Sequence, residues 1–317
     1  MGKDNQPDGV NHPPAVMTSS AREAMMQQDK GRFSKFCSIV ARLWYWLKLF
    51  SEGQGFKDKM ILLPGTILRL LGFAIGSSKI PSLHAVVRRI SNPGFDVRIE
   101  NRDGKFFCRK GTVDAQFVAE AYEYAFRRYF EEITQGVFVD VGANIGKYTI
   151  KVARQVGDNG RVISIEPESC NFEILKANIK LNRLSNVTLV NAACWNKNEK
   201  LKLYLAQLPG DHSVKEPVST DFVEVSALKL DDILKHLQIE YVSFIKIDAE
   251  GADGEVLEGA EKTIARNPYL KIVFEATNED NLAKCQEVLE KHGFAIVRVV
   301  NWGIYYARKA PEAISRA

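Results

Sequence analysis

Two kinds of apolar pattern alternate along the chain from residue 137 onward. Short, nearly continuous apolar runs predict buried strands, and longer segments with apolar residues on one side predict helices. The predicted strands are 137–141, 162–166, 187–191, 242–248, 271–275, 294–299 and 304–307. The predicted helices are 146–156, 169–182, 230–237, 253–265 and 279–292. This alternation predicts an α/β fold, with a seven-stranded, mostly parallel sheet and helices on both of its faces.

Other segments surround this regular pattern. An insertion at 200–225 follows the third strand and contains two short strand patterns, 201–205 and 222–225, around Pro209-Gly-Asp-His-Ser213. Upstream, the alternating runs 95–100 and 105–109 flank Asn101-Arg-Asp-Gly104, which predicts a hairpin. Residues 114–132 are predicted to form one long helix, whose aromatic side chains line the core and the wall of a cleft.

The N-terminal third has a different character. Residues 31–50 are rich in aromatic residues and carry only positive charges, but their apolar run is shorter than the roughly 20 residues that a membrane span needs. A break at 51–59 is followed by the apolar segment 60–76, which Pro64-Gly65 interrupts. Two interpretations stay open: a helical cap that packs on the main domain or a second subunit, and a helix that lies on a membrane surface.

Charge is divided unevenly along the 317 residues. Residues 1–110 carry a net charge of +9, whereas residues 111–317 carry −5. This asymmetry argues against a nucleic-acid groove across the whole protein and favours an N-terminal surface that meets an anionic partner. The five cysteines are scattered without a C-x-x-C pair, so neither a metal site nor a disulfide framework is predicted, and a reducing compartment is expected.

These patterns predict four parts. Residues 1–30 are polar and show no signal-peptide pattern, so we expect a disordered tail. A helical basic and aromatic extension covers 31–94, a hairpin with the lead-in helix covers 95–135, and the main domain covers 136–309. A cytoplasmic location follows, and peripheral attachment to the cytoplasmic face of the membrane through residues 31–90 is the alternative left open.

The segment from Asp140 to Gly146 contains the clearest chemical signal. It is a glycine-rich turn between a predicted strand and a predicted helix, an arrangement that presents backbone N–H groups to a nucleotide-like ligand. Its order of Gly142, Asn144 and Gly146 does not match the G-x-G-x-x-G of dinucleotide sites. A carboxylate at Asp140 would repel a pyrophosphate but suits S-adenosylmethionine (SAM), which offers an ammonium group, hydroxyls and a sulfonium.

Three further acids follow predicted strands. Glu166 ends the second strand, 20 residues after Gly146, and can accept both hydroxyls of an adenosine ribose. Asp248 and Glu275 end the fourth and fifth strands. Because the carboxyl ends of parallel strands lie at one edge of a sheet, we expect these acids and Asp140 to form a single rim. An unpaired buried carboxylate is costly, so four of them indicate a site better than they indicate packing.

An ordered set of motifs resembles the FkbM family of SAM-dependent methyltransferases. The motifs are F-V-D-V-G-A-N-I-G, I-E-P, A-L-K-L-D-D-I-L, I-K-I-D-A-E-G-A-D and I-V-F-E, within about residues 137–276. Ala249 and Asp253 depart slightly from the family pattern, and neither departure removes a carboxylate. The resemblance implies a Rossmann-like class I methyltransferase fold and methyl transfer, mostly to hydroxyls of sugars, polyketides and related metabolites. It says nothing about residues 1–110.

The resemblance also implies roles for individual residues. Four residues of the turn would hold the methionine end and ribose of SAM: Asp140, Gly142, Asn144 and Gly146. Glu166 would bind the ribose hydroxyls, and Asn191, Ala192 and Ala193 would lie beside the adenine. Asp248 and Glu250 would line the cleft where the methyl group leaves, and we place Glu275 in the same substrate cleft.

A hydroxyl acceptor needs a base that takes its proton. His212 in the insertion matches this task by its ordinary pKa, and Asp248 matches it by its position. Oxygen ligands for Mg²⁺ are available, but nothing in their spacing demands a metal, so we predict none. We therefore predict an O-methyltransferase that acts on a small-molecule or lipid-linked glycan, with no nucleic-acid partner. Methylation of an amine or carboxylate, a non-catalytic membrane-associated scaffold and a homo-oligomer remain alternatives.

Overall fold

The computed structural model describes residues 43–74, 92–124, 127–206, 213–214, 220–300 and 303–309. The chain divides into two compact units, Met1–Tyr45 and Trp46–Ala317. Of the first unit only residues 43–45 are described, so the tail predicted for 1–30 lies outside the described residues. All of the described strands belong to the second unit.

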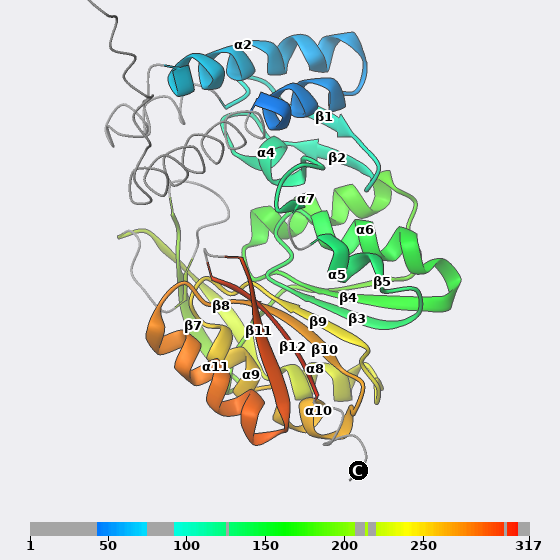
Figure 1. Cartoon of the computed structure of the whole chain (residues 1–317), viewed down its shortest axis with the longest axis vertical. Coiled ribbons are helices and arrows are strands. Elements are labelled where there is room, and N and C mark those ends of the chain that lie inside the picture. Colours follow the sequence, from blue (N-terminus) through cyan, green and yellow to red (C-terminus); the bar gives the residue numbers. More distant parts are fainter. Residues whose placement is uncertain are drawn as a thin grey trace, which may run out of the picture. The chain divides into compact units, whose positions relative to one another are not determined.

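A seven-stranded sheet forms the centre of the described part of this unit (Figure 1). Strands β3, β4, β5, β9 and β10 pair in parallel, and β12 runs antiparallel to both of its neighbours, β10 and β11. The order is β11-β12-β10-β9-β3-β4-β5. The chain first adds β4 and β5 on one side of β3 and then returns to add β9 on its other side, so the direction of strand addition reverses between β3 and β9. The predicted seven-stranded, mostly parallel sheet is confirmed. Its bounds are β3 Gly136–Val141, β4 Gly160–Ile165, β5 Val187–Val190, β9 Phe244–Ile247, β10 Lys271–Glu275, β11 Phe294–Val300 and β12 Ile304–Lys309.

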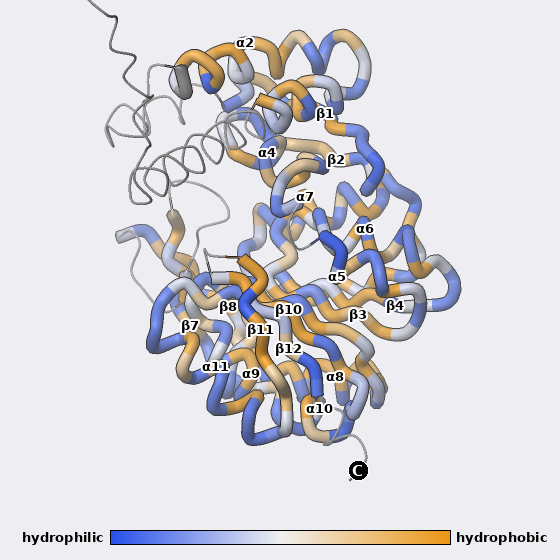
Figure 2. Tube along the Cα trace, viewed as in Figure 1, coloured by the Kyte–Doolittle hydropathy of each residue, from blue (hydrophilic) through white to orange (hydrophobic). Residues whose placement is uncertain are grey.

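Both faces of the sheet are covered by an apolar core. Successive residues of a strand point to opposite faces, so consecutive apolar residues supply both cores. Val139 belongs to a core shared with the helices α8 to α11, whereas its neighbour Phe138 packs with α5 and α6. The strands accordingly contain long apolar stretches (Figure 2). The helices are α5 Arg127–Glu131, α6 Lys147–Val156, α7 Ser169–Leu181, α8 Leu230–His236, α9 Asp253–Glu258, α10 Glu261–Arg266 and α11 Glu279–Lys291, and a short 3-10 helix, η3 Gly157–Asn159, follows α6.

The single helix predicted for 253–265 is wrong, since the segment forms α9 and α10. The carboxylate of Asp231 accepts hydrogen bonds from the backbone N–H groups of Lys262 and Thr263, at 2.9 and 2.8 Å. It therefore acts as an N-terminal cap for α10, supplied by another helix. A cap from a distant residue leaves no local signal in the sequence.

The long helix predicted for 114–132 is also wrong. The segment contains α4 Asp114–Val118 and α5, and an irregular stretch that includes Ala119 and Glu123 separates them. Ala119 is extended, with φ −53° and ψ 139°, and Glu123 has a left-handed φ of 55°. The break exposes backbone groups that a continuous helix would have paired.

Tertiary partners satisfy those backbone groups. The ammonium of Lys147, at the start of α6, donates to the carbonyl oxygens of Tyr122 at 2.8 Å and Ala119 at 3.3 Å. The carboxylate of Glu52 accepts from the N–H of Glu120 at 3.2 Å. These bonds replace the helical hydrogen bonds lost at the break, so the irregular stretch is held in place.

The predicted hairpin is confirmed as β1 Val97–Glu100 and β2 Lys105–Cys108. Asn178 of α7 and Asn182, which caps its C-terminus, pair with the free edge of β2 in the manner of a neighbouring strand. Asn178 binds both the N–H of Phe107, at 2.7 Å, and its carbonyl, at 3.3 Å. Asn182 binds the N–H and carbonyl of Lys105 at 2.9 and 2.6 Å. The exposed edge of the hairpin is thereby covered, and the hairpin is fixed to the main domain.

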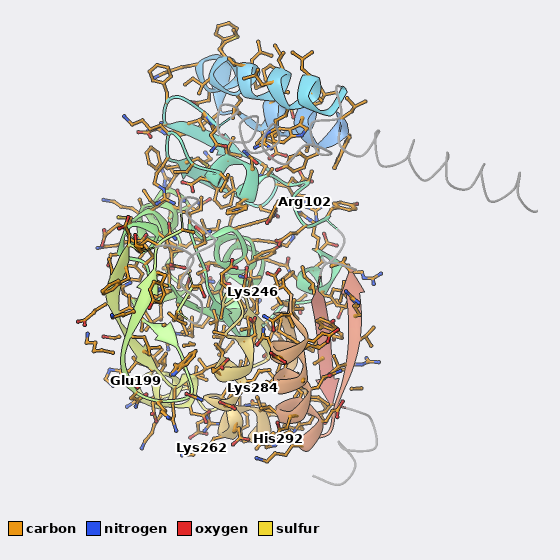
Figure 3. The ribbon with its side chains drawn as sticks, turned by 90° about the vertical axis from the view of Figure 1, so that its left-hand side faces the viewer. Arg102, Glu199, Lys246, Lys262, Lys284 and His292 are labelled. Atoms are coloured by element: carbon orange, nitrogen blue, oxygen red, sulfur yellow. The ribbon has the colours of Figure 1, made fainter. Side chains whose placement is uncertain are left out.

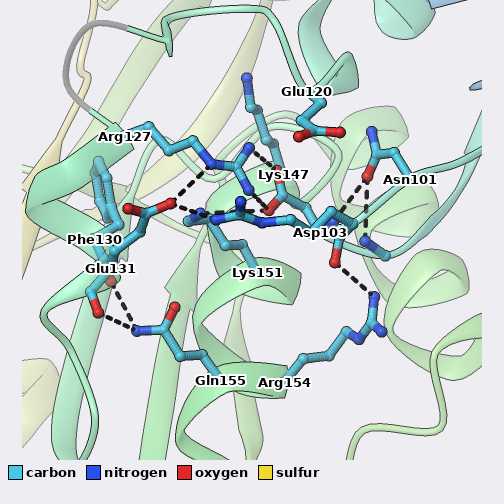
Figure 4. A network of polar contacts seen from close by, with 12 residues as sticks. Asn101, Asp103, Glu120, Arg127, Phe130, Glu131, Lys147, Lys151, Arg154 and Gln155 are labelled. Atoms are coloured by element: carbon cyan, nitrogen blue, oxygen red, sulfur yellow. Dashed lines mark hydrogen bonds and ion pairs between the residues drawn. The ribbon is translucent and has the colours of Figure 1, made fainter.

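A buried ion cluster holds the hairpin turn on α5 and α6 (Figure 4). Asp103 lies 2.6 and 2.9 Å from the two terminal nitrogens of Arg127, and 3.4 Å from the ammonium of Lys151. All three residues are buried. Removing Asp103 would take away the carboxylate that both buried cations share, at a cost of about 3–5 kcal/mol.

Two additions flank the main sheet. The insertion forms a small sheet of β6 Ala193–Cys194, β8 Phe222–Leu228 and β7 Glu199–Tyr204. Near the N-terminus, residues 46–52 are helical and α2 Gly55–Ala74 packs near β1. The predicted break at 51–59 is limited to Gly53 and Gln54, and α2 continues through Pro64. No helix in the described ranges is long and apolar enough to cross a membrane.

Candidate functional site

A pocket of about 650 Å³ opens at the carboxyl ends of β3, β4 and β9. This is the point where the direction of strand addition reverses, the usual ligand position in open α/β sheets. The pocket, called the donor pocket below, is lined by Val141, Gly142, Asn144, Ile165, Glu166, Pro167, Asn171, Ala192, Ala193, Cys194, Leu203, Val214, Asp248, Ala249 and Glu250.

The glycine-rich turn forms one wall of the donor pocket. Gly142, Asn144 and Gly146 all have left-handed φ angles, of 71°, 50° and 98°. A Cβ added to Gly142 would lie only 1.9 Å from the carbonyl oxygen of Asp248, so the turn and the end of β9 fit together only without a side chain. The buried Oδ1 atom of Asn144 has no hydrogen-bond partner in the described part of the chain. The turn thus offers an unused acceptor to a ligand with donor groups.

Glu166 lines the donor pocket beside the turn. One of its oxygens accepts from the N–H of Asn144 at 2.8 Å, and the other accepts from the N–H of Glu168 at 3.0 Å. Burial raises the pKa of Glu166 to about 7, although the two backbone hydrogen bonds lower it. The carboxylate is held rigidly, and each oxygen retains a lone pair for a ligand hydroxyl.

SAM affinity is expected to depend on the ionisation of Glu166. Ligand hydroxyls donate to the charged form, so affinity should fall as the pH is lowered through about 7. Glu166→Gln should bind SAM about 10- to 100-fold more weakly at pH 8, and with little pH dependence. Calorimetry between pH 6 and pH 8 measures both effects, with Glu173→Gln on the exposed side of α7 as the matched control. Equal pH dependence in Glu166→Gln and the native protein would contradict this role.

Asp140 lies beneath the turn and is not among the residues that line the donor pocket. Its Oδ2 atom accepts from the hydroxyl of Thr149 at 2.6 Å, and its Oδ1 atom lies 3.6 Å from the ammonium of Lys246. Burial raises the pKa of Asp140, and Lys246 counteracts this effect. In this structure Asp140 supports the turn from the protein side.

The segment after β5 lies at the far end of the donor pocket. Ala192 and Ala193 line it, whereas the amide of Asn191 donates to the carbonyl oxygens of Glu166 and Pro167, at 2.8 and 3.2 Å. Asn191 therefore holds the backbone next to Glu166, and the two alanines present a small apolar surface.

Asp248 also lines a second, open pocket, called the acceptor pocket below. The acceptor pocket is lined by Glu123, Lys246, Ile247, Asp248, Val273, Phe274, Glu275 and Ile304. Glu250 lines the donor pocket only. The structure thus brings Asp248 and Glu275 together at the rim and adds Glu123 from the irregular stretch. His212 lies outside the described residues.

Lys246, labelled in Figure 3, compensates the charge of the acids around it. Its ammonium donates to Asp248 and to the carbonyl of Gly142, both at 3.1 Å, and it faces Asp140. Burial by itself would lower the pKa of Lys246, but Asp248 and Asp140 raise it well above its ordinary value. Lys246 remains charged and neutralises the acids beside it.

The pKa values of the other two acids of the acceptor pocket, Glu275 and Glu123, are both raised. Burial, followed by the charge of Asp248, raises the pKa of Glu275 to about 9, so Glu275 is protonated at neutral pH. Burial also raises the pKa of Glu123, whereas Lys147 lowers it. Glu123 accepts a hydrogen bond from the hydroxyl of Tyr148.

The sequence patterns assigned no role to Glu123 or Lys246. Glu123 stood inside a predicted continuous helix, where nothing distinguishes it from a surface acid. Lys246 carried a usable signal, because it is a charged residue within the apolar run of a predicted strand. Such a residue is buried only with partners, and here the partners are the rim acids.

Comparisons with known proteins agree with this geometry. The profile of the Methyltransferase FkbM domain matches residues 140–296. "Methyltransferase 1" of Beauveria bassiana is 24% identical over 182 residues, which cover 50% of this chain and 72% of that protein. "Methyltransferase sdnD" of Sordaria araneosa is 25% identical over 226 residues, covering 59% and 84%.

Solved structures are also similar to this chain. The crystal structure of an FkbM methyltransferase from Methylobacillus flagellatus is 20% identical, with a TM-score of 0.40, and the match covers 55% of this chain and 43% of that one. This chain therefore spans less than half of that protein. The M. jannaschii TYW2 structure in complex with AdoMet is 15% identical, with a TM-score of 0.36 and coverage of 68% and 84%.

The strand order, the glycine-rich turn and the acid of β4 define a Rossmann-like methyltransferase domain that uses SAM. Within that class, residues 140–296 of this chain form a Methyltransferase FkbM domain. SAM fits the donor pocket: the unpartnered Asn144 oxygen suits a donor group of the ligand, Glu166 suits the ribose, and Ala192 and Ala193 suit the adenine.

Proposed function

We propose that this protein transfers the methyl group of SAM to a hydroxyl oxygen of a sugar, glycolipid or related metabolite. One observation carries the proposal. Asp248 lines both the donor pocket and the acceptor pocket, and two further acids, Glu123 and Glu275, line only the second. A protonated carboxyl group such as that of Glu275 can bind a hydroxyl of the acceptor, and a neighbouring carboxylate can take its proton.

Bound SAM supplies an electrophilic methyl carbon on a sulfonium. The chain's own task is to place the acceptor oxygen in line behind that carbon and to remove its proton. The new oxygen–carbon bond forms while the carbon–sulfur bond breaks, its electron pair stays on sulfur, and the hydroxyl proton passes to a carboxylate. Since the sulfonium charge disappears in this step, a pocket with little water favours it.

Glu123 is the acid we assign as this proton acceptor. The charge of Asp248 is compensated by Lys246 at 3.1 Å, and Glu275 is already protonated at neutral pH. Glu123 has a raised pKa, which makes its carboxylate a better base. Its left-handed backbone at the pocket wall is a strained conformation of the kind that clusters at functional sites.

The test uses SAM carrying a labelled methyl group together with fractionated cell extract. The expected result is labelled product and S-adenosylhomocysteine, with mass spectrometry placing the label on a hydroxyl oxygen as a methyl ether. Label on nitrogen or on a carboxylate would show that the acceptor is an amine or a carboxylate and not a hydroxyl. Tight SAM binding without S-adenosylhomocysteine in any fraction would favour a non-catalytic scaffold and would overturn the proposal.

A further inference from the structure

The outward face of α2 is apolar along its length. Phe56, Met60, Pro64, Ile67 and Leu71 are exposed and recur every three or four residues, so they form one stripe, called the α2 stripe below. Phe56 is 82% exposed and Leu71 is 56% exposed. Figure 2 shows the apolar character of this helix.

The inward face of α2 already has its partners. Leu62 and Thr66 are buried and, with Trp46, Leu49 and Ala115, surround a small cavity beneath the helix. The helix therefore packs on its own unit through this inward face. The α2 stripe lies on the other side of the helix and is not part of that packing. A contiguous apolar patch of this kind marks an interaction surface.

Charge indicates what that surface meets. Residues 31–94 contain ten Lys and Arg but only two acids, Glu52 and Asp58. On α2 itself, Lys57, Lys59 and Arg69 stand against Asp58 alone. A second copy of the chain would bring two such basic segments together, and their repulsion would oppose pairing. An anionic bilayer offers both an apolar interior and a negative surface.

We propose that the α2 stripe enters the headgroup region of an anionic lipid bilayer, with α2 lying parallel to the membrane surface. With about 1.5 Å of rise per residue, the α2 stripe from Phe56 to Leu71 extends along roughly 23 Å of the interface. Basic side chains each add about 1 kcal/mol near such a surface, so the attraction is both apolar and electrostatic. This attachment does not depend on which atom the enzyme methylates.

The test is co-sedimentation of the full chain with phosphatidylcholine vesicles, with and without phosphatidylserine. We expect binding to the anionic vesicles, and at least a tenfold weaker partition for the double variant Phe56→Glu, Leu71→Glu. Tyr269→Glu is the matched control, because Tyr269 is an exposed aromatic residue outside α2. Lys57→Ala with Lys59→Ala should weaken binding to anionic vesicles, and so should raising the ionic strength from about 0.05 to about 0.5 M.

Calorimetric SAM affinity equal to that of the native protein shows that each variant is folded. Equal sedimentation of the double variant and the native chain would overturn the proposal. So would a native dimer, measured by light scattering, that dissociates in the double variant while neither protein binds vesicles. That result would assign the α2 stripe to a second copy of the chain.

Discussion

Replacing Gly142 by alanine is expected to weaken SAM binding by at least 100-fold. Two effects combine at this position. A left-handed backbone costs an L-residue about 1–2 kcal/mol, and the new Cβ would lie 1.9 Å from the carbonyl oxygen of Asp248. The clash involves backbone on both sides, so either the turn or the end of β9 must move. Either movement displaces Gly142, Asn144 or Asp248, which line the donor pocket, and an overpacking cost of about 1–3 kcal/mol adds to the strain.

Gly111 provides a control with the same backbone angle. Its φ is also 71°, but a Cβ there would meet no atom within 4 Å. Gly111→Ala should therefore show only the conformational cost, as a loss of about 1–2 kcal/mol of unfolding free energy with unchanged SAM affinity. Denaturant unfolding of both variants measures the cost of the backbone strain, and calorimetry measures the effect of the close contact on SAM affinity. Equal SAM affinities of Gly142→Ala and Gly111→Ala would show that the close approach to Asp248 is not required.

The second large effect is expected for Glu123→Gln. Loss of a positioned base reduces turnover by about 10²- to 10⁴-fold, while SAM affinity should stay unchanged because Glu123 lines only the acceptor pocket. Turnover is measured as S-adenosylhomocysteine formed with the extract fraction that accepts label. Asp248→Asn should differ, since Asp248 lines both pockets and pairs with Lys246, so both turnover and SAM affinity should fall.

The pH profile adds a readout that a purely structural role would not change. Turnover of the native enzyme should rise as Glu123 loses its proton, and should fall as Glu275 loses its proton near pH 9. At saturating SAM, where the ionisation of Glu166 does not limit binding, the rising limb should disappear in Glu123→Gln and the falling limb should remain. Glu132→Gln, an exposed acid near the start of the domain, is the matched control. Unchanged turnover in Glu123→Gln would remove this residue from the chemistry and return the role to Asp248.

Much of the fold and of the donor pocket followed from local patterns. Apolar runs such as 137–141 and 271–275 identified strands because both faces of a central sheet are buried. The glycine-rich turn was recognisable because its backbone angles and close contacts admit few residue types. Glu166 and Asp248 were recognisable because acids that end predicted strands converge on one edge of a parallel sheet.

The sequence by itself determined the α/β architecture, the donor pocket and the family, since each rests on periodicity or on an ordered set of short motifs. Only the tertiary structure decided where the predicted helix 114–132 breaks and which residues the break presents. Lys147 and Glu52 stabilise that break from other elements, and their contribution has no local pattern in the chain. The same holds for Asp231 at α10 and for the acceptor pocket. Contacts between distant residues outweigh local propensity there, and those contacts exist only once the chain has folded.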